Sequence, residues 1–195
     1  MPPSAKVCET AMKSLARCLG WIFGLTMLAL SIMVTIETLV RKLFSISLGG
    51  VDELSGYAVA IAGPLAITIA LIECAHIRIN IFYLRMSRPA RRVLDVLSMI
   101  ALTILSGFLS FFAYRTVMDT YQFKSLAQTP WATPMIYPQS LWLLSLLIFT
   151  ATTLFLLIRS FVFLKHKDWE AMDQILAPES LEDELKAELE DLKVR

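Results

Sequence analysis

Long apolar runs separated by short charged stretches dominate this chain of 195 residues. Residues 18–36, 54–72 and 96–114 contain no charged side chain, and a fourth strongly apolar run extends from 140 to 158. A helix as long as one of these 19-residue runs spans roughly 28 Å, which matches the hydrocarbon core of a bilayer at about 30 Å. Because the backbone must pair its own N–H and C=O groups inside that core, each run favours a helix. The pattern predicts an all-α integral membrane protein with four transmembrane helices.

The predicted membrane domain covers residues 19–164, and its apolar runs lack the polar stripe that a helix in a soluble bundle carries. The first run is longer than the apolar part of a cleavable signal peptide, so we expect it to be retained as a helix. The four helices are expected at about residues 19–40, 54–75, 93–114 and 138–162.

Two polar tails flank this domain. Residues 1–18 are basic, and their apolar positions share one helical face, as in a helix that lies in the membrane interface. Residues 165–195 are acidic and carry leucines at helical spacing. A short isolated helix is marginally stable, which favours a half-ordered acidic tail, and binding to a protein surface is the alternative.

Composition excludes several classes of function. The chain is 56% hydrophobic and 18% charged, whereas soluble domains carry about 25% charged residues. A net charge of +1 gives no clustered basic face for nucleic acid. The cysteines Cys8, Cys18 and Cys74 have the spacing of neither a disulfide framework nor a zinc site. We therefore expect membrane lipids, and not nucleic acid, around this chain.

Lysine and arginine predict the orientation. They are frequent in the N-terminal tail, in the second loop at residues 77–92 and just after the fourth helix, and sparse in the first and third loops. The positive-inside rule then places both termini and the second loop in the cytoplasm. All three cysteines fall on that side, where thiols stay reduced.

Few side chains suit catalysis. An acid within a membrane helix is a functional candidate by default, and Glu37 is the best candidate for an ion or proton relay. Local pairing explains most of this signal, because acids one turn from an arginine on the same helix can form ion pairs. We predict no catalytic residue, no metal and no cofactor. The acids with such neighbours are Glu37 near Arg41, Asp95 near Arg91 and Asp119 near Arg115.

The two histidines support an alternative function. His76 and His166 both fall at predicted cytoplasmic helix ends, and haem iron can be held by one histidine from each of two helices. His166 also lies between two lysines, which is typical of a stop at the membrane surface. A haem-bearing membrane anchor of a respiratory enzyme therefore stays open beside a non-enzymatic role.

The third loop is rich in aromatic residues and prolines, including Pro130, Trp131 and Pro134. Prolines disfavour a regular helix, and aromatic rings favour the headgroup level of a membrane. The loop is either an interfacial connector or a rigid docking surface facing outward. In the third helix, Ser106, Gly107 and Ser110 predict a face for close helix packing.

Several short motifs, in order and at fixed spacing, resemble the small membrane subunit of TRAP transporters, the DctQ component of the tripartite ATP-independent periplasmic family. The resemblance covers residues 19–163. It departs from the family pattern at Lys42, Ala66, residues 72–74 and Asn80. The segments that carry it are Arg41-Lys42-Leu43-Phe44, Asp52-Glu53-Leu54, His76-Ile77-Arg78-Ile79-Asn80 and the proline-rich third loop.

The resemblance implies a structural subunit of a bacterial inner-membrane transporter. In that family a periplasmic solute-binding protein captures an organic acid and a large multi-helix permease carries it inward with sodium. The small subunit supports the permease and offers docking surface to the binding protein. A stand-alone small transporter that depends on Glu37 is a further alternative. The residues expected to serve docking or scaffolding are Arg41, Glu53, His76, Arg78, Pro130, Trp131 and Pro134.

Overall fold

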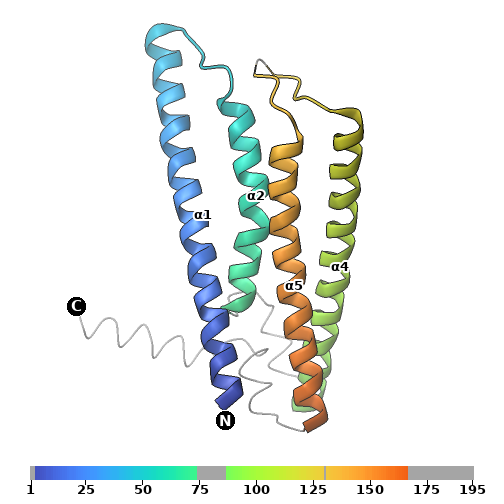
Figure 1. The fold of residues 1–195 in the computed structure, drawn as a ribbon. Coiled ribbons are helices and arrows are strands. Elements are labelled where there is room, and N and C mark those ends of the chain that lie inside the picture. The colour runs from blue at the N-terminus through green and yellow to red at the C-terminus, as the bar shows by residue number, and fades with distance from the viewer. Residues whose placement is uncertain (1–2, 74–86, 130, 167–195) are drawn as a thin grey trace, which may run out of the picture.

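The computed structural model describes residues 3–73, 87–129 and 131–166, and this part of the chain folds into long helices. Each described helix contains an apolar stretch long enough to cross a membrane. The all-α prediction with four membrane-spanning helices is therefore confirmed. The helices are α1 (Pro3–Phe44), α2 (Val51–Ile72), α4 (Arg88–Phe123) and α5 (Ile136–His166) (Figure 1).

The helices α1, α4 and α5 extend beyond the apolar runs that predicted them. Residues 3–18 are the first turns of α1 and do not form a separate helix. Arg41 belongs to the last turn of α1, and Arg115 lies within α4, although the sequence placed both in loops. Charged side chains mark where hydrocarbon ends, but their backbone remains helical because long polar side chains are good helix formers. The predicted sites His76, Arg78 and Pro130 and the tail from 167 onward lie outside the described residues.

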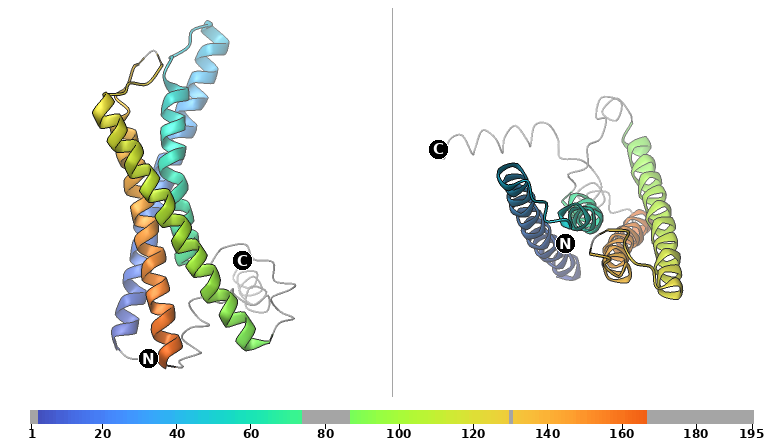
Figure 2. Two further views of the ribbon diagram at one scale, coloured as in Figure 1. Left: turned by 90° about the vertical axis from the view of Figure 1, so that its right-hand side faces the viewer. Right: turned by 90° about the horizontal axis from the view of Figure 1, so that it is seen from above.

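The helices stand in an open row. The substantial contacts join α1 to α2, α2 to α5, and α5 to α4. Viewed from above, α1 and α4 occupy the outer positions and α2 and α5 the inner ones (Figure 2). The loops 45–50 and 124–135 lie together at one end, which we call the loop end, and Pro3 and His166 lie at the other, the terminal end (Figure 1). The alternating directions of the helices thus bring two distant loops side by side.

One cluster of the apolar core lies between the middle of the molecule and its terminal end. Leu71, Met99, Phe149 and Leu156 are buried there, and Met12 of α1 packs against them. Toward the loop end, α1 diverges from α2 (Figure 1). This cluster joins all four helices.

Hydroxyl side chains join α4 to α5. Ser106 and Thr153 are fully buried and their hydroxyl oxygens lie 3.0 Å apart, and those of Ser110 and Thr150 lie 2.8 Å apart. Small residues let membrane helices approach closely and hydrogen-bond across the contact. The predicted packing face is confirmed at Ser106 and Ser110. It is wrong at Gly107, where an added Cβ would meet nothing within 4 Å.

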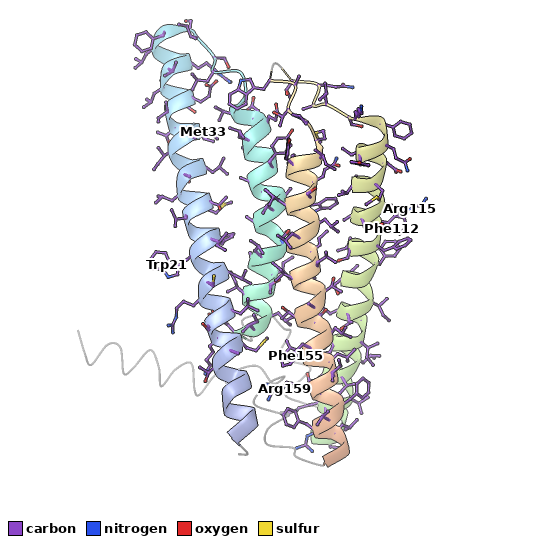
Figure 3. The ribbon with its side chains drawn as sticks, in the orientation of Figure 1. Trp21, Met33, Phe112, Arg115, Phe155 and Arg159 are labelled. Carbon is purple, nitrogen blue, oxygen red and sulfur yellow. The ribbon has the colours of Figure 1, made fainter. Side chains whose placement is uncertain are left out.

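The outer faces of the row are apolar and exposed. Trp21 on α1 and Phe112 and Arg115 on α4 point away from the bundle (Figure 3). Trp21 is 70% exposed, and among residues 10–44 of α1 only Ala16, Leu19 and Glu37 are buried. In a bilayer, such faces are covered by lipid or by the helices of another subunit.

Candidate functional site

A buried carboxylate on α1 binds the first loop at the loop end through hydrogen bonds. Glu37 accepts hydrogen bonds from Arg41 Nη2 at 2.6 Å and Nε at 3.1 Å, from Ser47 Oγ at 2.8 Å and from the backbone N–H of Leu48 at 2.8 Å. Its side chain is only 6% exposed, and a buried carboxylate is costly unless it is paired and hydrogen-bonded. We call Glu37, Arg41, Ser47 and Leu48 the Glu37 cluster.

The backbone of this loop bends through left-handed conformations at Ser45 (φ 55°) and Gly49 (φ 72°). The Glu37 cluster holds the residues between these bends against the last turn of α1. The predicted ion pair of Glu37 with Arg41 is confirmed. Arg115 and Asp119, which have the same spacing on α4, form no ion pair within the described part of the chain.

The third loop folds into a short hairpin. Lys124 ends α4 in a left-handed conformation (φ 49°), and the chain then turns back on itself. The Ala127 N–H donates to the Thr133 carbonyl at 2.9 Å, and the Met135 N–H donates to the Ser125 carbonyl at 3.1 Å. The aromatic, proline-rich loop is thus ordered by its own backbone, with Trp131 close to its tip.

A second buried carboxylate ties this hairpin to α2. Glu53, in the first turn of α2, accepts hydrogen bonds from Tyr57 Oη at 2.7 Å and from the hydroxyl of Thr129, 76 residues away. The side chain of Thr133 also hydrogen-bonds to Glu53. The Tyr57 hydroxyl in turn lies 3.3 Å from the sulfur of Met135. We call Glu53, Tyr57, Thr129 and Thr133 the Glu53 cluster.

Trp131 joins the two loops through Gly50. Gly50 is buried, and a Cβ added to it would lie 2.2 Å from Cε2 of the Trp131 indole. Such a separation is impossible for real atoms, so the indole occupies the space that only a glycine leaves free. The loops therefore form one continuous surface. Its exposed apolar side chains are Ile46, Leu48, Leu126 and Trp131.

Comparison with protein families identifies the chain. The family model described as tripartite ATP-independent periplasmic transporters, DctQ component, matches residues 30–163. The chain belongs to the DctQ family. A comparison with curated proteins finds no match. A DctQ component is part of a transporter and not an enzyme, which confirms the sequence-based resemblance and favours transport over a haem-bearing anchor.

The DctQ fold gathers four of the predicted site residues at the loop end. Glu53 is buried and accepts from the hairpin, whereas the Arg41 side chain is 56% exposed and donates to Glu37. Trp131 and Pro134 are exposed on the hairpin itself. The structure therefore brings these four docking or scaffold candidates to one end of the molecule, and their role in docking stays a prediction.

Other residues that shape the DctQ loop end were missed. Ser47, Gly50, Thr129 and Thr133 make the contacts that build the surface, yet none was singled out. The signal for Gly50 is its position in a glycine pair directly before a helix, where close approach of another segment is common. Threonines in a loop carry no comparable signal, because their usual partners are local backbone groups.

Proposed function

We propose that this small TRAP transporter subunit supports the large permease subunit in the membrane and offers its loop end as docking surface for the periplasmic solute-binding protein. The assembled system would take up an organic acid together with sodium ions. The observation that carries the proposal is the union of two distant loops into one ordered, partly apolar surface by the Glu53 cluster and by the contact between Gly50 and Trp131.

The distribution of basic residues supports an outward-facing loop end in a bacterial inner membrane. Basic residues near the terminal end include Lys13, Arg17, Arg91, Arg92 and Arg159. Cytoplasmic segments of membrane proteins carry an excess of such residues. With the terminal end inside, both termini are cytoplasmic, and the joined loops face the periplasm, where a binding protein delivers its solute.

The open row of helices supports a lateral partner in the membrane. A closed four-helix bundle would bury one face of every helix, but here α1 and α4 each have one substantial neighbour. Their remaining apolar faces give a large permease room to pack against this chain. The subunit would thereby widen the stationary body of the transporter.

Assembly is tested by co-purification. The full chain is tagged and extracted in mild detergent from cells that express the permease, and the proteins retained with it are identified. We expect the large permease subunit to be retained. The support function is contradicted if the chain purifies alone and the permease transports normally in its absence.

Docking is tested with Trp131→Ala in the reconstituted transporter, by measuring capture of the solute-binding protein and solute uptake. We expect weaker capture and normal assembly, because the indole is 52% exposed on the joined surface. Trp21→Ala, which removes an indole from the membrane-facing side of α1, is the matched control. Unchanged capture and uptake with Trp131→Ala would count against docking at this surface.

Arg41→Glu should also weaken capture, by an indirect route. The new carboxylate would face Glu37 and break the cluster that shapes residues 45–49. Arg41→Lys keeps the charge but loses the paired N–H groups, so we expect an intermediate effect. If Arg41→Glu disorders the loop but leaves capture unchanged, the loop has no part in docking.

A further inference from the structure

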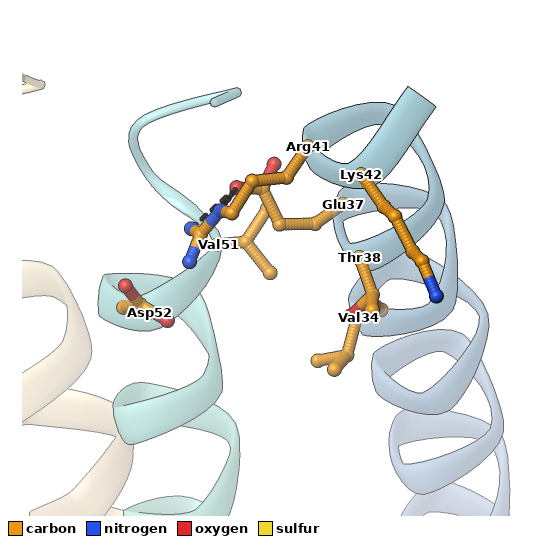
Figure 4. A pocket seen from close by; sticks show the side chains of 7 residues that line it. All are labelled: Val34, Glu37, Thr38, Arg41, Lys42, Val51 and Asp52. Carbon is orange, nitrogen blue, oxygen red and sulfur yellow. Dashed lines mark hydrogen bonds and ion pairs between the residues drawn. The ribbon is translucent and has the colours of Figure 1, made fainter. Parts of the chain in front are cut away.

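An open pocket of about 320 Å³ lies between α1 and α2 at the loop end (Figure 4). Arg41 and Lys42 of α1 and Asp52 of α2 line it together with apolar side chains such as Val34 and Val51. Arg41 extends from α1 toward α2, and Lys42 points back along α1 (Figure 4). The pocket thus combines two cations and the Arg41-paired acid Glu37 on one helix, the acid Asp52 on the other, and an apolar part.

The charges in this pocket are incompletely paired. Arg41 uses Nε and Nη2 for the Glu37 cluster, which leaves the two N–H groups of Nη1 without a partner among the described residues. Lys42 and Asp52 have no side-chain hydrogen bond or ion pair within the same part of the chain. Positive and negative groups therefore line the pocket at separate positions. Each of them can bind a ligand group of opposite charge.

The position of the pocket relates these charges to the membrane. The uncharged run of α1 ends at Ile36, and the charged residues that α1 gives to the pocket follow within the next two turns, while Asp52 lies in the first turn of α2. The end of such a run marks the boundary between hydrocarbon and headgroups. The pocket lies at that boundary, on the side where α1 diverges from α2 (Figure 1).

We propose that this pocket binds the headgroup of an ethanolamine phospholipid. The lipid phosphate would lie between Lys42 and the free Nη1 group of Arg41, and its ammonium group would donate to Asp52. The acyl chains would run down the apolar side past Val34. The bound lipid fills the opening between α1 and α2 and ties together the two helices that flank the first loop.

The charge pattern discriminates among phospholipids. A phosphatidylglycerol headgroup carries a net negative charge and would bring no cation to Asp52. A phosphatidylcholine headgroup is zwitterionic but has no N–H group to donate. Ethanolamine matches both the phosphate-binding cations and the ammonium-binding acid, because its primary ammonium is compact and has three N–H donors.

The test is lipid retention by the full-length chain. The chain is purified in detergent, delipidated, and mixed with equal amounts of phosphatidylethanolamine, phosphatidylglycerol and phosphatidylcholine, and retained lipids are counted by native mass spectrometry. We expect phosphatidylethanolamine to be preferred. Lys42→Gln should lower its retention roughly five- to tenfold, the effect of one charged contact. Asp52→Asn should abolish the preference over phosphatidylcholine.

Matched controls come from α4 at the same end of the molecule. Lys124→Gln and Asp119→Asn remove one basic and one acidic exposed side chain away from the pocket, and both should retain phosphatidylethanolamine as the unaltered chain does. Circular dichroism verifies that every variant keeps its helices. The proposal is overturned if no lipid is retained, if phosphatidylglycerol is preferred, or if folded Lys42→Gln and Asp52→Asn variants retain lipid as their controls do.

Discussion

Glu37 and Glu53 are both buried carboxylates at the loop end, but their hydrogen-bond donors lie at different distances along the chain. The donors to Glu37 lie 4 to 11 residues further along the chain and include a charged arginine. Glu53 accepts from hydroxyl groups in the described part of the chain, and one of them is 76 residues away. The Glu37 cluster shapes its own loop, whereas the Glu53 cluster positions a hairpin that belongs to other helices.

The first loop is therefore ordered by local contacts, whereas the hairpin is positioned by tertiary contacts. The first loop can form as soon as α1 and the following residues are in place. The third-loop hairpin has its own backbone hydrogen bonds, but its position over α2 depends on Glu53 and Gly50. A surface for a protein partner needs both kinds of order, because loops that must be immobilised on binding weaken affinity.

Of the four substitutions that follow, Glu53→Ala should disturb the structure of the loop end most. The substitution removes the acceptor that the hydroxyl groups of Tyr57 and Thr129 share, and hydrogen bonds to a charged group are stronger than those between neutral groups. Hydrogen exchange should become faster at the amides of Ala127 and Met135 and stay unchanged at Leu48. Equal acceleration in both loops would show that the two clusters are not independent.

A somewhat smaller effect is expected from Gly50→Ala, which forces Trp131 away from α2. Overpacking against a rigid side chain typically costs about 1–3 kcal/mol. The ¹⁹F signal of fluorinated Trp131 should shift or broaden. Gly56→Ala on the same helix is the control, because a Cβ there meets nothing within 4 Å. A Trp131 signal that is identical in both variants would refute the close contact.

Glu37→Gln should disturb only the first loop, and by less than the two preceding substitutions disturb the hairpin. The amide keeps an acceptor oxygen for Ser47 or Leu48 but loses the charge that pairs with Arg41, so part of the hydrogen bonding in the loop survives. Hydrogen exchange at Leu48 should accelerate while Ala127 stays protected. Loss of protection in the hairpin would mean that the first loop also supports the hairpin.

The smallest effect is expected from Thr153→Val, which removes a hydrogen bond between neutral side chains of the consecutive helices α4 and α5. Interhelical hydrogen bonds in membranes are worth about 0.6 kcal/mol on average. Unfolding in mixed micelles should reveal a loss near that size. Thr116→Val is the control, since the Thr116 hydroxyl donates only to the Phe112 carbonyl of its own helix. A loss as large as that of Glu53→Ala would overturn the ranking of charged over neutral contacts.

The amino-acid sequence by itself determined that four helices span a membrane and that Glu37 can pair with Arg41. Both follow from distances along one helix: the bilayer thickness sets the length of an apolar run, and one turn separates the paired residues. Helix ends were misplaced at Arg41 and Arg115, because charge marks the limit of hydrocarbon and not the limit of helical backbone.

Only the tertiary structure decided the order of the helices and the partners of Glu53 and Gly50. The row α1–α2–α5–α4 places α2 beside a helix that is not its neighbour in the chain, and thereby brings Thr129 and Trp131 to the start of α2. No periodicity encodes such contacts, because they depend on the complementary shapes and hydrogen-bonding groups of segments 76 residues apart.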